Sequence, residues 1–142
     1  MLGDWYADCL FIGRRRLVLV VSESSLLSVV VPARDIKNLA VHVQSGLELL
    51  LSTLGVSQEI VHAELREMKE VQYARTASRV VLGCMIDLAF HIKCRFESGA
   101  EPSMNDLALE LSKVFLSPIG NHHPREVAVG LLSRSHPKEL VQ

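Results

Sequence analysis

The chain has 142 residues, of which 15 are Lys or Arg and 16 are Asp or Glu, and 49% of it is hydrophobic. This length fits one domain, and the apolar content excludes an intrinsically disordered chain. The net charge of -1 gives no overall attraction to nucleic acid, although a local basic patch stays open. Three cysteines cannot form a disulfide framework and no signal-peptide pattern precedes them, so we expect a cytoplasmic protein.

The predicted elements begin with three strands, at residues 5–12, 16–21 and 26–31. The last two are too short for membrane spans, which need ~20 apolar residues, and a polar turn separates them. Short connections are typical of an antiparallel meander. The third strand is almost entirely apolar, so either both of its faces are covered or its edge is hidden in a dimer.

Apolar residues at helical spacing predict four helices, at residues 36–54, 58–68, 77–97 and 103–116. Asp35 is a candidate N-cap for the first helix, and Gly55 is placed for a left-handed C-cap after it. Ser103 and Asp106 have the spacing of a capping box. A short fourth strand is expected at residues 70–75, between the second and third helices.

These elements predict an α+β fold: an N-terminal antiparallel meander and a short fourth strand, packed against about four helices, with the 77–97 helix central. Residues 1–116 are expected to form the single domain. Proline, glycine, asparagine and histidine accumulate afterwards, so residues 117–142 are expected to be loop or tail, with a short apolar element at residues 127–132.

Three stretches resemble a family of bacterial domains of unknown function: residues 5–7, the arginine-rich turn after Ile12, and residues 75–87. Its members read W-[YH]-A-N-L-L, then a basic turn, then K-T-x-x-R-S-V-L-G-S-M-N-D. The resemblance covers about residues 4–95 and implies a compact α+β domain without an assigned activity. Family members usually carry a further strand and helix before the tryptophan that corresponds to Trp5. We expect that this segment has been lost here or that the start of the sequence was assigned too late.

The chain departs from the family pattern at five positions: Asp8 for Asn, Arg75 for Lys, Val80 for Ser, Cys84 for Ser and Ile86 for Asn. The start of the long helix is therefore more apolar in this chain than at the same positions of the family pattern.

The first candidate site is the start of the 77–97 helix. Thr76 and Ser78 are candidate caps, and Arg75 and Arg79 flank the same turn. A helix N-terminus offers free N–H groups and a partial positive charge, and two guanidinium groups would add to its attraction for a small anion or a phosphate backbone. The alternative is an ordinary cap whose arginines pair with nearby acids. No glycine-rich phosphate-binding loop is present.

The second candidate lies along the same helix, where Cys84, Asp87, His91 and Cys94 share an arc of roughly 80°. Asp87 and His91 are the candidate general acid and base, and together with Cys84 they are the candidate metal ligands. No cofactor or metal is expected, because the two cysteines lie too far apart on one helix to share an ion. The alternative is a helix buried nearly all round, in which Asp87 orients His91 as an internal pair.

A third, weaker candidate is the predicted hairpin tip, where Arg14, Arg15 and Arg16 could contact phosphate, with Trp5 and Tyr6 nearby for base stacking. The alternative is a solvated turn whose charges protect a sheet edge.

These features favour a non-catalytic interaction or anion-binding module. One alternative is an enzyme acting on a phosphorylated or other anionic substrate, and another is a nucleic-acid-binding adaptor. The high aliphatic content of so short a chain predicts that some apolar surface is shared with a second copy, so we expect a homodimer. An unidentified protein or a small anion is a further expected partner, and no membrane association is expected.

Overall fold

The computed structural model describes residues 2–33, 36–68, 71–73, 79–114 and 123–135. Within those ranges it confirms the predicted α+β arrangement with its strands at the N-terminus. The strands are β1 (Trp5–Ile12), β2 (Arg15–Ser22), β3 (Ser28–Pro32) and β4 (Val71–Tyr73). The helices are the short 3-10 turn η1 (Ile36–Asn38), α1 (Leu39–Thr53), α2 (Gln58–Glu67), α3 (Arg79–Glu97), α4 (Met104–Leu111) and α5 (Pro124–Ser135).

The four strands form one sheet in the order β3-β2-β1-β4. β1 and β2 run antiparallel as a hairpin with Ile12 opposite Arg15, and β2 pairs antiparallel with β3, which confirms the predicted meander. The short fourth strand pairs parallel to β1, with Trp5 opposite Val71. A parallel partner needs a crossover connection, and α1 and α2 lie in that connection, between β3 and β4.

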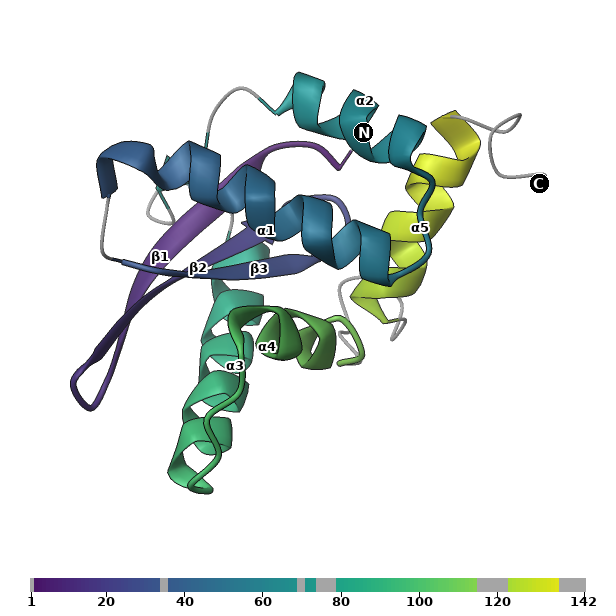
Figure 1. Cartoon of the computed structure of the whole chain (residues 1–142). Helices are drawn as coiled ribbons and strands as arrows, with labels where there is room; N and C mark the ends of the chain where they lie inside the picture. The colour runs from purple at the N-terminus through teal and green to yellow at the C-terminus, as the bar shows by residue number, and fades with distance from the viewer. Residues whose placement is uncertain (1, 34–35, 69–70, 74–78, 115–122, 136–142) are drawn as a thin grey trace.

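Both faces of the sheet are covered (Figure 1). Along β2, Val18 and Val20 enter the first core cluster, while Leu17, Leu19 and Val21 enter the second. The first cluster contains buried residues of α1, α2 and α5, and the second contains those of α3. β3 alternates in the same way, so the expectation that both of its faces are covered is confirmed.

α4 contributes to both core clusters because it lies along β3, at the edge of the sheet. Its Ala108 belongs to the first cluster, and its Leu107 and Leu111 belong to the second. The predicted capping box starts this helix: the Asp106 N–H donates to Ser103 Oγ at 3.0 Å, and the Ser103 N–H donates to Asp106 Oδ2 at 3.2 Å.

The caps predicted at the two ends of the first helix can be compared with the structure only at the C-terminal end. Gly55 has a φ of +88° directly after α1, as expected for a left-handed C-cap. The candidate N-cap Asp35 lies outside the described residues, and Asn38 occupies the N-cap position of α1. No helix in the described part of the chain is both long and apolar enough to cross a membrane.

α5 lies in the region that the sequence leaves as loop or tail. This 12-residue helix is longer than the short apolar element predicted at residues 127–132. Pro124 occupies its first position, where the missing N–H of proline costs no hydrogen bond. Ala128 and Leu132, one turn apart, are fully or almost fully buried in the first core cluster. Tertiary packing therefore makes this segment part of the domain.

Leu2, the first described residue, is fixed on both sides of its backbone. Its N–H donates to Glu64 Oε1 on α2 at 2.9 Å, and both atoms are buried. Its carbonyl oxygen accepts hydrogen bonds from Ser22 Oγ at 2.5 Å and Ser24 Oγ at 2.6 Å. The Leu2 side chain is 0% exposed. Because Glu64 is itself only 4% exposed, this hydrogen bond is a structural link between the chain start and α2.

Replacing Glu64 tests this link. Glu64→Ala leaves a buried N–H without its acceptor, so we expect the free energy of unfolding to fall by about 1–3 kcal/mol. Glu64→Gln keeps a carbonyl oxygen at the same position and is expected to lose less. Urea unfolding followed by circular dichroism measures both variants, with Glu59→Ala on the exposed side of α2 as the control. Equal stability of Glu64→Ala and the wild type would contradict the role of this bond.

Candidate functional site

Only part of the predicted anion site at the start of α3 can be located. Arg75, Thr76 and Ser78 lie outside the described residues. Arg79 is the first residue of α3 and its side chain is exposed. The anion site at these four residues therefore stays a prediction.

The acid, base and thiol candidates do not form one cluster. Cys84 is buried in the second core cluster, whereas Asp87, His91 and Cys94 are exposed. Asp87 and His91, which the structure both describes, share no hydrogen bond or ion pair. The alternative of a helix buried nearly all round is wrong, because the second core covers only the arc that includes Val81, Met85, Leu88 and Ile92.

His91 lies at the rim of a groove of about 320 Å³ between α3 and α4. Arg95 Nε on α3 donates to Glu110 Oε1 on α4 at 2.8 Å across this rim. Below the rim the groove is apolar, lined by Ile92, Leu107, Leu111 and Val114. Arg79 is 12 residues away along α3, which corresponds to roughly 18 Å. The groove therefore does not combine His91 with the arginine that the enzyme hypothesis needs.

The candidate metal ligands are likewise not brought together. No group of three His, Cys, Asp or Glu side chains suited to hold a metal ion occurs among the described residues. Cys84 is buried in the second core, whereas Asp87 and His91 are exposed. These three residues therefore form no ligand set.

Burial raises the pKa of the Cys84 thiol, and the negative charge of Asp87 adds to the shift. The thiolate is the reactive form of cysteine, so Cys84 is kept in its unreactive, protonated state at neutral pH. A folded-state pKa above the unfolded value stabilises the fold below the unfolded pKa of the thiol. That contribution is lost as the pH rises through the folded value, in the alkaline range.

Alkylation kinetics can test this assignment. With iodoacetamide at neutral pH we expect Cys9 and Cys94, which are exposed, to react in the native protein. Cys84 should react at least ~10-fold more slowly, and should reach the rate of the other two in urea. Peptide mass spectrometry over time resolves the three sites. Fast native alkylation of Cys84 would show that its thiol is accessible and would reopen a nucleophilic role.

The described structure places a different set of basic residues around a cavity. At the tip of the β1–β2 hairpin, a cleft of about 430 Å³ is lined by three arginines and one carboxylate: Arg14, Arg15, Arg16 and Glu101. The remainder of its lining is Leu17, Pro32, Ala33, Phe96, Pro102 and Met104. We call this cavity the arginine cleft.

The three arginines differ in what holds them. Arg15 Nη2 donates to Glu101 Oε1 at 2.5 Å, and its guanidinium carbon lies 4.5 Å from the centre of the Phe96 ring. The guanidinium carbon of Arg16 lies 5.8 Å from the centre of the Phe11 ring. Arg14 has no hydrogen-bond or ion-pair partner in the described part of the chain. Arg15 is therefore held at the cleft by Glu101 and Phe96, while neither Arg14 nor Arg16 has an ion-pair partner in the described part of the chain.

The aromatic residues expected beside the hairpin are not there. Trp5 and Tyr6 are 2% and 7% exposed, and they lie at the end of β1 opposite the turn. The aromatic rings near the arginines are Phe11, which is 71% exposed, and Phe96 from the last turn of α3. Phe11 could have been found from the sequence, because it lies two residues before the turn. Phe96 could not, because only the tertiary fold brings it to the hairpin.

The fold and these surfaces define a small α+β domain with a cleft lined by basic residues. The chain belongs to the family described as "Domain of unknown function (DUF6933)", whose model matches residues 1–127. The resemblance to a family of unknown function is therefore confirmed.

One solved structure has a similar fold. The catalytic core domain of BIV integrase aligns over 96% of this chain and 99% of that chain, with a TM-score of 0.56 and 15% sequence identity. At this identity the similarity is one of fold alone. No curated protein matches the chain.

Proposed function

We propose that this domain is a non-catalytic binding module that takes an anionic ligand in the arginine cleft. The observation that carries the proposal is the lining of that cleft, whose described residues include three arginines and one carboxylate. The excess of positive charge is local, since the whole chain has a net charge of -1. Such a local excess attracts an anion to one place without making the protein a general nucleic-acid binder.

The arrangement of the arginines suits a phosphate or carboxylate group. A guanidinium presents its N–H groups as a planar fork that pairs with two oxygens of one anion. Arg15 is already held by Glu101 and Phe96, so less side-chain entropy is lost when a ligand binds against it. Arg15 and Glu101 are 42% and 79% exposed, so the cleft is open to water and salt should weaken anion binding there.

The positions of the acid and base candidates support the non-catalytic form of the proposal. Neither Asp87 nor His91 lines the arginine cleft. A reaction on the bound anion would need a proton donor or acceptor within hydrogen-bond distance. Among the described residues of the lining, Glu101 is the one carboxylate, and it is paired with Arg15.

A nucleic-acid-binding adaptor is the second candidate, and the exposure of Phe11 beside Arg16 favours it. Single strands bind where an exposed aromatic ring stacks with a base and nearby arginines contact the phosphates. The two candidates share the same arginines and differ in whether a base is needed in addition to phosphate.

Binding measurements separate these possibilities. We expect inorganic phosphate or a short single-stranded oligonucleotide to raise the melting temperature of the wild type. Arg14→Ala and Arg16→Ala should each weaken the affinity at least ~10-fold by removing a charged contact. Glu101→Gln should bind more tightly, because it removes the negative charge that competes for Arg15. Phe11→Ala should affect only the oligonucleotide.

Arg79→Ala is the matched control, because it removes an exposed arginine outside the cleft. Its affinity should equal that of the wild type. A loss of binding confined to Arg79→Ala would move the anion site to the start of α3 and overturn the arginine cleft. The absence of any response to both ligands in the wild type would overturn the anion-binding function.

A further inference from the structure

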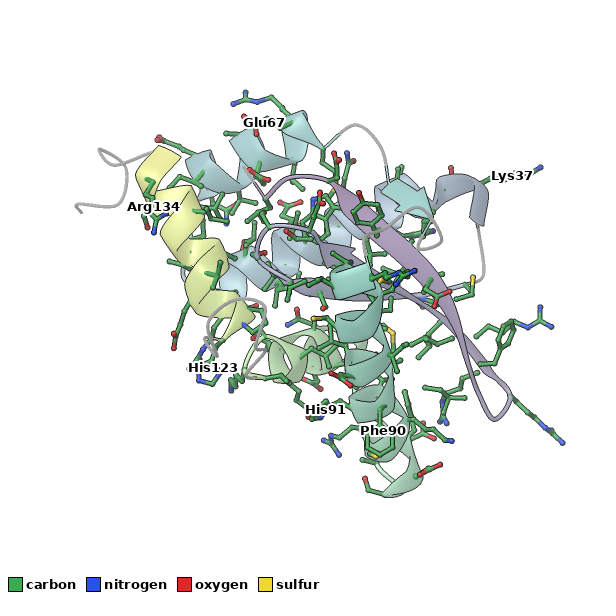
Figure 2. The ribbon with its side chains drawn as sticks, turned by 180° about the vertical axis from the view of Figure 1, so that it is seen from behind. Lys37, Glu67, Phe90, His91, His123 and Arg134 are labelled. Atoms are coloured by element: carbon green, nitrogen blue, oxygen red, sulfur yellow. The ribbon has the colours of Figure 1, made fainter. Side chains whose placement is uncertain are left out.

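The outer side of α3 carries large apolar side chains in contact with water. Val80, Ile86 and Phe90 are 57%, 71% and 64% exposed. Gly83 lies between them, and a Cβ atom built there would meet no atom within 4 Å. The helix extends beyond the sheet in Figure 1, and Figure 2 shows the Phe90 ring on α3 with no other element in front of it. No element in the described part of the chain therefore covers this side.

The residues on this side are arranged symmetrically about the middle of the helix. Leu88 is the central residue of α3 as described, Arg79–Glu97. Residues at equal distances from this midpoint form three pairs: Arg79 with Glu97, Gly83 with Lys93, and Ile86 with Phe90. At 100° per residue all six fall within an arc of roughly 80°. We call this arc the α3 outer face.

We propose that the α3 outer face docks onto a second copy of this chain, with the two α3 helices antiparallel about a two-fold axis near Leu88. The symmetry argues for this occupant, because a two-fold contact requires a surface that is complementary to itself. In this arrangement the basic Arg79 at the start of one helix lies opposite the acidic Glu97 at the end of the other. Ile86 packs against Phe90 twice, once on each side of the axis.

The charge of the face also favours a second copy over a strongly charged partner. The face carries two basic residues, Arg79 and Lys93, and one acidic residue, Glu97, and Asp87 lies just outside it. Lys93 and Glu97 of the same helix are 3.9 Å apart with both side chains more than half exposed, so this pair is weak and leaves the Glu97 carboxylate accessible. Gly83 leaves room for the stem of Lys93 from the second copy. Antiparallel helices also place opposite ends of their dipoles together.

The contact is expected to be weak. A helix of 19 residues is roughly 28 Å long, and one helix pair buries less than a standard protein interface. We therefore expect a monomer–dimer equilibrium with a dissociation constant on the order of 10–100 μM. This inference does not depend on the anion-binding function, since the arginine cleft and the α3 outer face share no residue.

Analytical ultracentrifugation of the full chain from about 10 μM to 1 mM tests the proposal. Ile86→Glu and Phe90→Glu place a charge in the centre of the contact and should raise the dissociation constant at least ~10-fold. Leu49→Glu is the matched control, because Leu49 is 53% exposed on α1, which packs on the other face of the sheet. It should dimerise like the wild type. Circular dichroism confirms that each variant is folded.

A charge exchange tests the antiparallel arrangement. Arg79→Glu and Glu97→Arg should each weaken the dimer, and the double variant should restore it because both ion pairs are rebuilt with reversed sign. Gly83→Leu should fold normally, since the space around Gly83 is open in one chain, yet should also weaken the dimer.

Three results would overturn the inference. The first is a wild type that stays monomeric up to 1 mM. The second is a dimer that survives Ile86→Glu and Phe90→Glu, or that Leu49→Glu dissociates instead, which would place the contact on another surface. The third is a double charge variant as weak as its single parents, which would exclude the antiparallel register.

Discussion

From Leu17 to Val21, no residue of β2 is more than 4% exposed, so this strand is stable in water only when both faces of the sheet are covered. The rest of the fold meets that requirement. α1 and α2 cover one face, the chain returns to the sheet as the parallel strand β4, and α3 covers the other face. α5 then adds two buried residues to the first core. The hydrophobic burial of one central strand thus determines on which side each helix lies.

The same constraint explains where the candidate sites are. The helices cover the part of the sheet that β2 buries, and the hairpin tip extends beyond them, so Phe11 and the three arginines remain exposed. α3 uses one arc to cover the sheet and presents the opposite arc to solvent. Both surfaces therefore remain exposed because the helices cover only the core of the sheet, and both are accessible to a binding partner. The arginine cleft exists because the end of α3 and the start of α4 return to the hairpin.

Local sequence patterns predict much of this fold. The apolar runs of β2 and β3 indicate strands, and the capping box of Ser103 and Asp106 indicates the start of α4, because these signals involve residues close in the chain. The buried arc of α3 follows from helical periodicity. The parallel orientation of β4 and the docking of α5 depend on which segments meet in space, so no local pattern contains them.

The candidate site was less predictable than the fold for the same reason. Arg15 and Glu101 are 86 positions apart in the chain, and neither the ion pair nor the cleft has a sequence signature. The sequence placed Trp5 and Tyr6 near the arginines because they share a strand, but that strand spans the sheet from end to end. Asp87 and His91 have the spacing of a helical pair, yet spacing does not decide whether two exposed side chains bind each other.

The position of α4 along β3 affects how a destabilised chain would aggregate. β3 is an edge strand with the sequence Ser-Val-Val-Val-Pro, and an uncovered valine-rich edge is a template for pairing with other chains. α4 covers this edge and is joined to α3 by the exposed ion pair between Arg95 and Glu110. Local opening of α4 would therefore expose this strand edge together with the core side chains of Leu107, Ala108 and Leu111. Aggregation through β3, rather than reversible unfolding, is the expected end of a destabilised chain.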